Sequence, residues 1–251
     1  MLLEITQEEL TDALERTVTE VLWEARVIEP PVDAVLAAQR LGLALVTDTQ
    51  AVHRGRCVRL AAGAESMTTS AILLAPEERP ERRQWTVAHE IGEWAAQRML
   101  AHLDIAAEGE EDPLRERCAN AFAGALLLPR RWFLADGHDL DWDLRALKPR
   151  YATASHELIA RRMIEMPAPA VITLFDHGRR VWRRGTEGLR VPPLLRAEED
   201  CQRQAHLSGK PAEADSNCDG AGQIRVRCWP VHEPGWRREI MRTEVQECEY
   251  L

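Results

Sequence analysis

The spacing of apolar residues changes from helical to strand-like along the first third of the chain. Residues 6–27 carry apolar side chains every three to four positions, which predicts an amphipathic helix, and Thr6 with Glu9 matches a capping box at its start. Pro30-Pro31 ends this helix and starts another that ends near Gly42. Runs of strand-forming residues bounded by turn residues then predict three strands, at 43–47, 57–61 and 71–74.

The next helical pattern, about residues 80–102, contains His89-Glu90-Ile91-Gly92-Glu93. At helical spacing His89 and Glu93 project from one face, while Glu90 lies about 100° around the axis. Metalloprotease helices have this arrangement, with two metal ligands and a neighbouring carboxylate that acts as general base. Glu93 stands where such helices usually carry a second histidine. On this helix alone, a structural ion pair between a buried histidine and a carboxylate explains the pattern equally well.

Two observations distinguish this motif from a chance His-Glu pair. The pairs His156-Glu157 and His232-Glu233 are not followed by a ligand at the corresponding position, so they act as internal controls. Gly92 is unfavourable in a helix interior by about 1 kcal/mol relative to Ala. Its presence therefore indicates that another segment approaches the helix closely.

A second helical pattern downstream provides a further carboxylate. Glu116, Ala119, Asn120 and Ala123 share one face, which begins with a carboxylate and otherwise carries small side chains. Pro129 marks the end of this helix. Such a helix can lie close to the first and bring Glu116 to the same point.

The motif helix followed by E-x-x-A-N-x-F-A-x-x-L-L-x-P resembles the ImmA/IrrE family of bacterial zincin-like metallopeptidases, over about residues 10–185. The resemblance implies that His89, Glu93 and Glu116 bind zinc, with manganese or iron as alternatives, and that Glu90 activates water. It also implies hydrolysis of a protein substrate, often a helix-turn-helix transcriptional repressor, in stress response or mobile-element control.

The Glu93 substitution leaves an alternative open. Two carboxylates neutralise a divalent ion, and a neutral site is a poorer Lewis acid. The alternative is a catalytically weak or inactive family member that acts as a regulator by binding a protein or DNA. The formal net charge of −9 argues against nonspecific nucleic-acid binding by the whole molecule.

The fold class expected from these elements is α+β, a zincin-like core of helices with a small antiparallel sheet. In zincins a sheet edge beside the active-site helix can hold an extended peptide, so Ile72 and Leu73 are candidate substrate-binding residues. The same strand fits an ordinary core strand equally well.

The second half of the chain predicts a helical segment and a small α+β appendage. Helices at 142–147 and 153–163 have a helix-turn-helix rhythm, but Ser155, His156 and Glu157 offer DNA little positive charge, so packing is the favoured interpretation. The expected domains are 1–136, 137–186 and 187–251. Further along, the pattern predicts a hairpin at 171–182, a helix at 193–206, a loop at 208–222, a strand at 223–229 and a strand or helix at 237–245.

Composition sets limits on location and redox chemistry. The 251 residues are 45% hydrophobic and contain neither an apolar run of about 18 residues nor a signal-peptide pattern, so we expect a cytoplasmic protein without membrane contact. Six cysteines without CxxC spacing are expected to be free thiols. Cys201, Cys218, Cys228 and His232 form a second, looser candidate zinc set.

Overall fold

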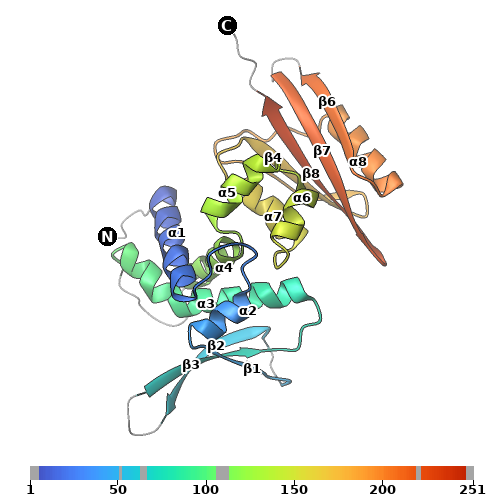
Figure 1. The fold of residues 1–251 in the computed structure, drawn as a ribbon. Helices are drawn as coiled ribbons and strands as arrows, with labels where there is room; N and C mark the ends of the chain where they lie inside the picture. The colour runs from blue at the N-terminus through green and yellow to red at the C-terminus, as the bar shows by residue number, and fades with distance from the viewer. Residues whose placement is uncertain (1–5, 51–52, 63–66, 106–112, 219–221, 247–251) are drawn as a thin grey trace. The chain divides into compact units, whose positions relative to one another are not determined.

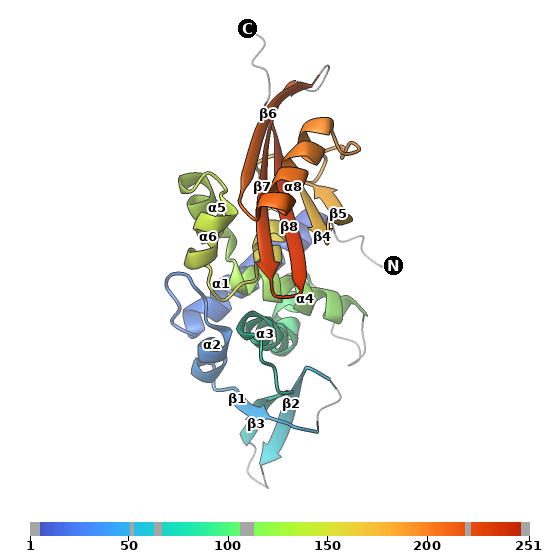
Figure 2. The ribbon, with the colours of Figure 1, turned by 90° about the vertical axis from the view of Figure 1, so that its right-hand side faces the viewer.

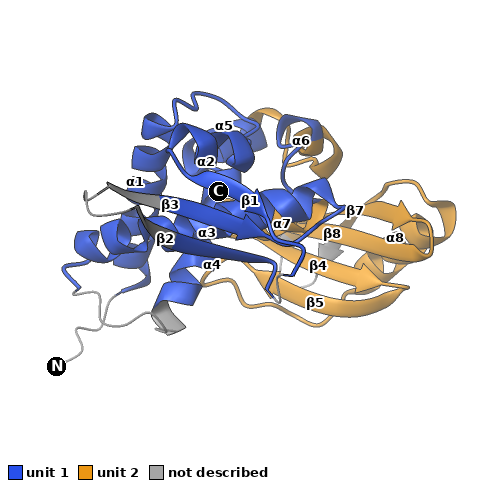
Figure 3. Cartoon of the chain, turned by 90° about the horizontal axis from the view of Figure 1, so that it is seen from below, with its two compact units in different colours: residues 1–138, 149–155 blue, residues 139–148, 156–251 orange. Residues whose placement is uncertain are grey.

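The computed structural model describes residues 6–50, 53–62, 67–105, 113–218 and 222–246, and the chain divides into two compact units (Figure 3). Unit 1 comprises residues 1–138 and 149–155, and unit 2 comprises residues 139–148 and 156–251. The two units consist of helices and two small sheets, which confirms the predicted α+β class. Among the described helices, none has both the length and the apolar composition that a bilayer crossing requires.

Unit 1 is organised around one long helix, α3, against which three other helices pack (Figure 1). The capping box predicted for α1 is confirmed, because Thr6 Oγ1 accepts from the Glu9 N–H and the Glu9 carboxylate accepts from the Thr6 N–H. The side chain of Asp33 caps α2 in a similar way. These helices span Gln7–Glu24 (α1), Ala34–Arg40 (α2), Pro80–His102 (α3) and Pro113–Leu127 (α4).

The sheet of unit 1 has the strand order β1-β3-β2, so β3 is the central strand. β1 pairs with β3 in parallel and β2 pairs with it antiparallel, so the sheet is mixed rather than wholly antiparallel. Ile72 and Leu73 of β3 are paired on both sides, and Ile72 is fully buried. The prediction that they line an open sheet edge is therefore wrong. The strands span Ala44–Thr47 (β1), Gly55–Ala62 (β2) and Met67–Leu74 (β3).

Helix α5 (Arg130–Asp139) follows α4 almost at once, so Pro129 separates two helices in addition to ending the first. Residues 149–155 return to this part of unit 1. Tyr151 donates a hydrogen bond to Asp136 Oδ2 at 2.7 Å, and its ring meets Phe133 edge-on with centroids 5.3 Å apart. Burial and the neighbouring Asp136 raise the pKa of Tyr151 above its usual range. Tyr151 therefore holds this segment on α5 as a neutral donor.

Unit 2 contains one antiparallel sheet with the strand order β5-β4-β8-β7-β6. Because β4 pairs with β8, the predicted domain boundary between residues 186 and 187 is wrong: the hairpin and the carboxy-terminal strands share a sheet. The predicted loop at 208–222 contains strand β6. The strands span Ala170–Asp176 (β4), Arg179–Gly185 (β5), Ala212–Cys218 (β6), Gly222–Glu233 (β7) and Trp236–Gln246 (β8).

Helix α8 (Arg196–Ser208) lies along one face of this sheet, as Figure 2 shows, and packs on β6, β7 and β8. The buried side chains between them include Cys201, Ala205, Ile224, Val226 and Met241.

The two helices with a helix-turn-helix rhythm are α6 (Leu144–Arg150) and α7 (His156–Met163). Helix α7 packs on β4 and β8. Its Glu157 pairs with Arg161 of the same helix and with Arg238 of β8. These contacts favour the packing interpretation of α7 over a DNA-reading one.

Helices α3 and α4 meet at Gly92. A Cβ atom at this position would lie 3.0 Å from Ala119 Cα, 3.1 Å from the Ala119 carbonyl oxygen and 3.1 Å from Phe122 Cβ. Two of these atoms belong to the backbone of α4 and the third is a Cβ atom, so all three move only with the helix. The close approach that Gly92 indicated in the sequence is therefore observed, and its partner is α4.

We predict that Gly92→Ala destabilises the protein although helix propensity alone favours Ala by about 1 kcal/mol. The added methyl group forces the two helices apart, and overpacking of this kind lowers the free energy of unfolding by about 1 to 3 kcal/mol. Urea denaturation of both proteins measures the difference. A variant as stable as the parent, or more stable, would show that the contact between α3 and α4 can accommodate a methyl group.

Candidate metal centre

Three side chains with metal-binding chemistry converge in unit 1. His89 and Glu93 come from successive turns of α3, and Glu116 comes from the first turn of α4. One potential ligand atom of each lies within 4.8 Å of those of the other two, and His89 Nε2 is 3.5 Å from Glu116 Oε2. Two donors about 2.1 Å from one tetrahedral zinc ion lie about 3.4 Å apart. The histidine and Glu116 therefore already stand at about the separation that a shared ion requires.

Neighbouring side chains orient the two carboxylates. Asn120, one turn after Glu116, donates to Glu116 Oε1 at 2.9 Å, which leaves Oε2 directed at His89. Arg115 Nε donates to Glu93 Oε2 at 2.5 Å, and its Nη2 donates to the Glu93 carbonyl oxygen at 3.1 Å. Such partners of metal ligands fix the orientation of the ligands and tune their basicity. Helical periodicity predicts Asn120 on this face, whereas no sequence pattern indicates Arg115.

Arg115 changes the charge balance expected from the sequence, in which two carboxylates neutralise a divalent ion. Glu93 and Glu116 carry two negative charges, and the guanidinium of Arg115 returns one positive charge to the same site. A divalent ion added to this set leaves a net charge of about +1, as it does in a site of two histidines and one carboxylate. The donor set of one imidazole and two carboxylates fits zinc, and it also fits manganese or iron.

Glu90 lies beside this cluster but is turned toward strand β2. Only 5% of it is exposed, and its carboxylate accepts a hydrogen bond from the main-chain N–H of Cys57. Burial raises the pKa of Glu90 from 4.5 to about 7, and the negative charges of Glu93 and Glu116 add to this increase. A carboxylate with a pKa near neutrality can both accept and return a proton at physiological pH.

Gly55 at the start of β2 makes room for Glu90. A Cβ atom at Gly55 would lie 2.7 Å from Glu90 Oε1 and 2.6 Å from Thr86 Cγ2. The role of Gly55 was not predicted, although a glycine in a strand can mark a close approach by another group.

The looser cysteine set predicted from the sequence is not assembled among the described residues. Cys201 and Cys228 lie in the apolar layer under α8, where burial raises the pKa of Cys201 to about 11 and that of Cys228 further. Metal binding needs thiolates, which this environment disfavours. The side chain of Cys218 lies outside the described set. His232 lies beside His206 and Glu239 instead.

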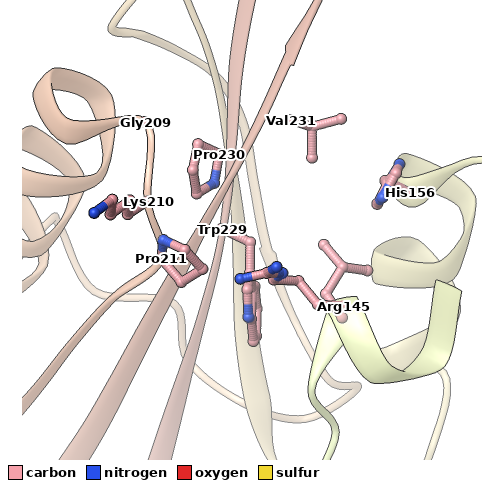
Figure 4. A pocket seen from close by; sticks show the side chains of 9 residues that line it. Arg145, His156, Gly209, Lys210, Pro211, Trp229, Pro230 and Val231 are labelled. Carbon is pink, nitrogen blue, oxygen red and sulfur yellow. The ribbon is translucent and has the colours of Figure 1, made fainter.

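A separate pocket of about 740 Å³ lies in unit 2 (Figure 4). Arg145, His156 and Lys210 are its titratable lining residues, and the indole of Trp229 is fixed there by a hydrogen bond to Asp143. The residues that line it include no carboxylate, so it lacks the general base and the anionic ligands of the cluster in unit 1.

We predict that, in metal-free protein, Glu90→Gln raises the free energy of unfolding by an amount that grows with pH. A raised pKa in the folded state means that the folded protein binds the Glu90 proton more tightly. The associated stabilisation is complete below pH 4.5 and is lost as the pH rises through about 7. Glutamine removes this loss, which is at most about 3 kcal/mol.

Urea denaturation in the presence of a chelator, at pH 5 and pH 8, measures the effect. The stability advantage of the variant should be larger at pH 8. An advantage that does not change with pH would show that Glu90 titrates normally.

Comparison with known proteins identifies the family. Residues 38–163, half of the chain, match the family model Peptidase_M78, described as the IrrE N-terminal-like domain. A search of curated proteins finds no match. Among solved structures, a Mycobacterium tuberculosis transcriptional regulator superposes with a TM-score of 0.60 at 18% sequence identity, over 92% of this chain and 87% of that one. The chain thus shares the fold of that regulator, and by its sequence it belongs to the Peptidase_M78 family.

Proposed function

We propose that the protein is a metal-dependent endopeptidase that hydrolyses a protein substrate at the centre formed by His89, Glu93 and Glu116. The observation that carries this proposal is the convergence of these three ligands next to a buried carboxylate, Glu90, with a pKa near 7. Membership of a peptidase family supports the same conclusion.

In this mechanism His89, Glu93 and Glu116 hold one divalent ion, for which zinc is the first choice. Such an ion supplies Lewis-acid chemistry, because it polarises the scissile carbonyl and makes water more acidic. Glu90 removes a proton from the attacking water through its carboxylate and then delivers this proton to the leaving amine. The Cys57 N–H holds the Glu90 carboxylate in place between these two steps.

Arg115 has a positioning role in this proposal. Its guanidinium fixes one oxygen of Glu93 and leaves the other oxygen for the ion. It also offsets the second carboxylate, so that the glutamate in place of histidine does not neutralise the centre. The same contact favours a second candidate function: if Arg115 keeps Glu93 away from metal, the protein is a regulator that binds its partner without cleaving it.

We assign the substrate edge to β2 rather than to β3. β2 is an edge strand of the order β1-β3-β2, and its residues Gly55 and Cys57 approach Glu90. A peptide that adds to a sheet edge is held by main-chain hydrogen bonds and so presents its own peptide bonds to the centre. We further propose a helix-turn-helix transcriptional repressor as the substrate, in keeping with the family and with the regulator of similar fold.

We predict that Glu90→Gln abolishes cleavage of the repressor without lowering metal content, whereas His89→Ala and Glu116→Ala each lose the ion bound at this centre. Glutamine keeps the shape of the side chain but cannot accept the proton, and loss of a ligand removes one of only three protein donors. Metal analysis and gel-based cleavage of a candidate repressor by the metal-loaded protein measure both effects.

A control variant for this experiment is His53→Ala, an exposed histidine that is not one of the three proposed ligands. Equal cleavage by Glu90→Gln and the parent protein would exclude Glu90 as the base. Metal binding without cleavage of any repressor tested would favour the regulator function.

We predict that Glu93→His alone weakens zinc binding, whereas the double variant Glu93→His/Arg115→Gln restores it. The single change leaves the Arg115 guanidinium without its anion and close to a cation. The double change yields two histidines and one carboxylate without that unpaired charge. Competitive zinc titrations of the two variants and of Arg115→Gln measure the coupling. Identical zinc affinities in the parent protein and all three variants would show that side chain 93 does not contact the ion.

A further inference from the structure

A second group of metal-binding side chains lies entirely within unit 2. His206 from the last turn of α8, His232 from β7 and Glu239 from β8 have potential ligand atoms that all lie within 4.8 Å of one another. His206 Nδ1 is 2.9 Å and His232 Nε2 is 2.6 Å from the same oxygen, Glu239 Oε1. Two imidazoles therefore converge on one carboxylate oxygen from different elements.

Glu239 is fully buried, so a negative charge there requires compensation. The hydrogen-bonding partners of its carboxylate in the described part of the chain are His206, His232 and Gln202. None of the three carries a permanent positive charge. A cation shared by all three groups would compensate a negative charge on Glu239.

The polypeptide holds these groups in position without a ligand. In the β7-β8 hairpin Pro230 pairs with Glu239 and His232 pairs with Arg237, so His232 and Glu239 are diagonal neighbours on one face of the sheet. Helix α8, which carries His206, is fixed to the sheet by Glu198, a fully buried residue that pairs with Arg183 at 3.0 Å. The side chains of His206, His232 and Glu239 therefore need little further ordering to bind one ligand together.

The surroundings of the cluster match those of a metal site. Gln202 Nε2 donates to Glu239 Oε2 at 3.2 Å, which leaves Oε1 facing the two rings, as partners of ligating carboxylates do. The side chains of His206 and His232 are 23% and 24% exposed, so an ion from solvent can reach the ring nitrogens. Glu239 Oε1 lies on the buried side of the cluster.

We propose that His206, His232 and Glu239 bind a divalent transition-metal ion of the zinc class, at a site separate from the centre on α3 and α4. Two imidazoles with one carboxylate form a donor set typical of zinc sites with three protein ligands. Donors around such an ion lie about 3.4 Å apart, so the rings move outward by less than 1 Å when the ion replaces the direct hydrogen bonds. The ion then links α8 to the β7-β8 hairpin.

Zinc titration of the chelator-treated full chain against a chromophoric competitor tests this site. We expect two ions per chain in the parent protein. His232→Ala should lose one of them, with an affinity at that site reduced by more than about 100-fold, because even an outer partner of a ligand contributes 10- to 100-fold. His89→Ala should retain the ion bound in unit 2, which separates this proposal from the peptidase centre. His177→Ala, an exposed histidine of the same unit, is the matched control and should bind as the parent does.

Two further variants keep the test independent of misfolding. Glu239→Gln preserves side-chain size and hydrogen bonding, so it should fold but bind the ion weakly, and Gln202→Ala should weaken binding by about 10- to 100-fold. Cobalt absorption in the His89→Ala background should show a tetrahedral spectrum that is lost when His232→Ala is added. No zinc bound by His89→Ala, or equal binding by the His232→Ala, Glu239→Gln and parent proteins, would overturn the proposal.

Discussion

The close contact between α3 and α4 at Gly92 is the constraint on which the candidate centre depends. Without a side chain at Gly92, the backbone of α4 approaches near Ala119 and brings Glu116 within 3.5 Å of His89. The same approach places Arg115 against Glu93. On another side of α3, Gly55 lets β2 lie against Glu90. Two glycines therefore bring the ligands, the proposed base and the balancing cation into one place, and a methyl group at either would separate them.

The electrostatics of the centre couple metal binding to protonation. Three carboxylates, those of Glu90, Glu93 and Glu116, share a small region with one guanidinium, so part of their repulsion is relieved by a proton on Glu90. A divalent cation bound beside Glu90 relieves the same repulsion, and so lowers the pKa of that group. Binding of the ion and release of the proton are therefore linked, and an ion that binds would leave Glu90 ready to accept a proton.

The features that the sequence predicted well are those encoded by neighbours along the chain. The span of α3, the capping box of Thr6 and Glu9, and the close approach at Gly92 each follow from helical periodicity or from one residue type. Helix α5 and strand β6 are local elements that the pattern did not reveal, and the errors at the candidate site concern pairings between distant segments. Alternation identifies β3 as a strand but cannot say whether a neighbour covers its edge, and β1 does so. Arg115 lies 22 residues from Glu93, so no local pattern joins them. The group of His206, His232 and Glu239 likewise depends on the hairpin register and on the placement of α8.

The strand order of unit 2 has a consequence for co-translational folding of the protein. β4 and β5 leave the ribosome before β8, with which β4 pairs in the folded protein. Until β8 has been synthesised, β4 and β5 can form only a two-stranded hairpin, which is marginally stable in water. All residues of unit 1 have by then been synthesised, since its last segment ends at residue 155. A nascent chain thus passes through a stage in which the peptidase-type unit can fold while the β4-β5 hairpin still exposes an unpaired edge. Chaperones that shield such edges, or mutations that delay β8 pairing, would act on unit 2 first.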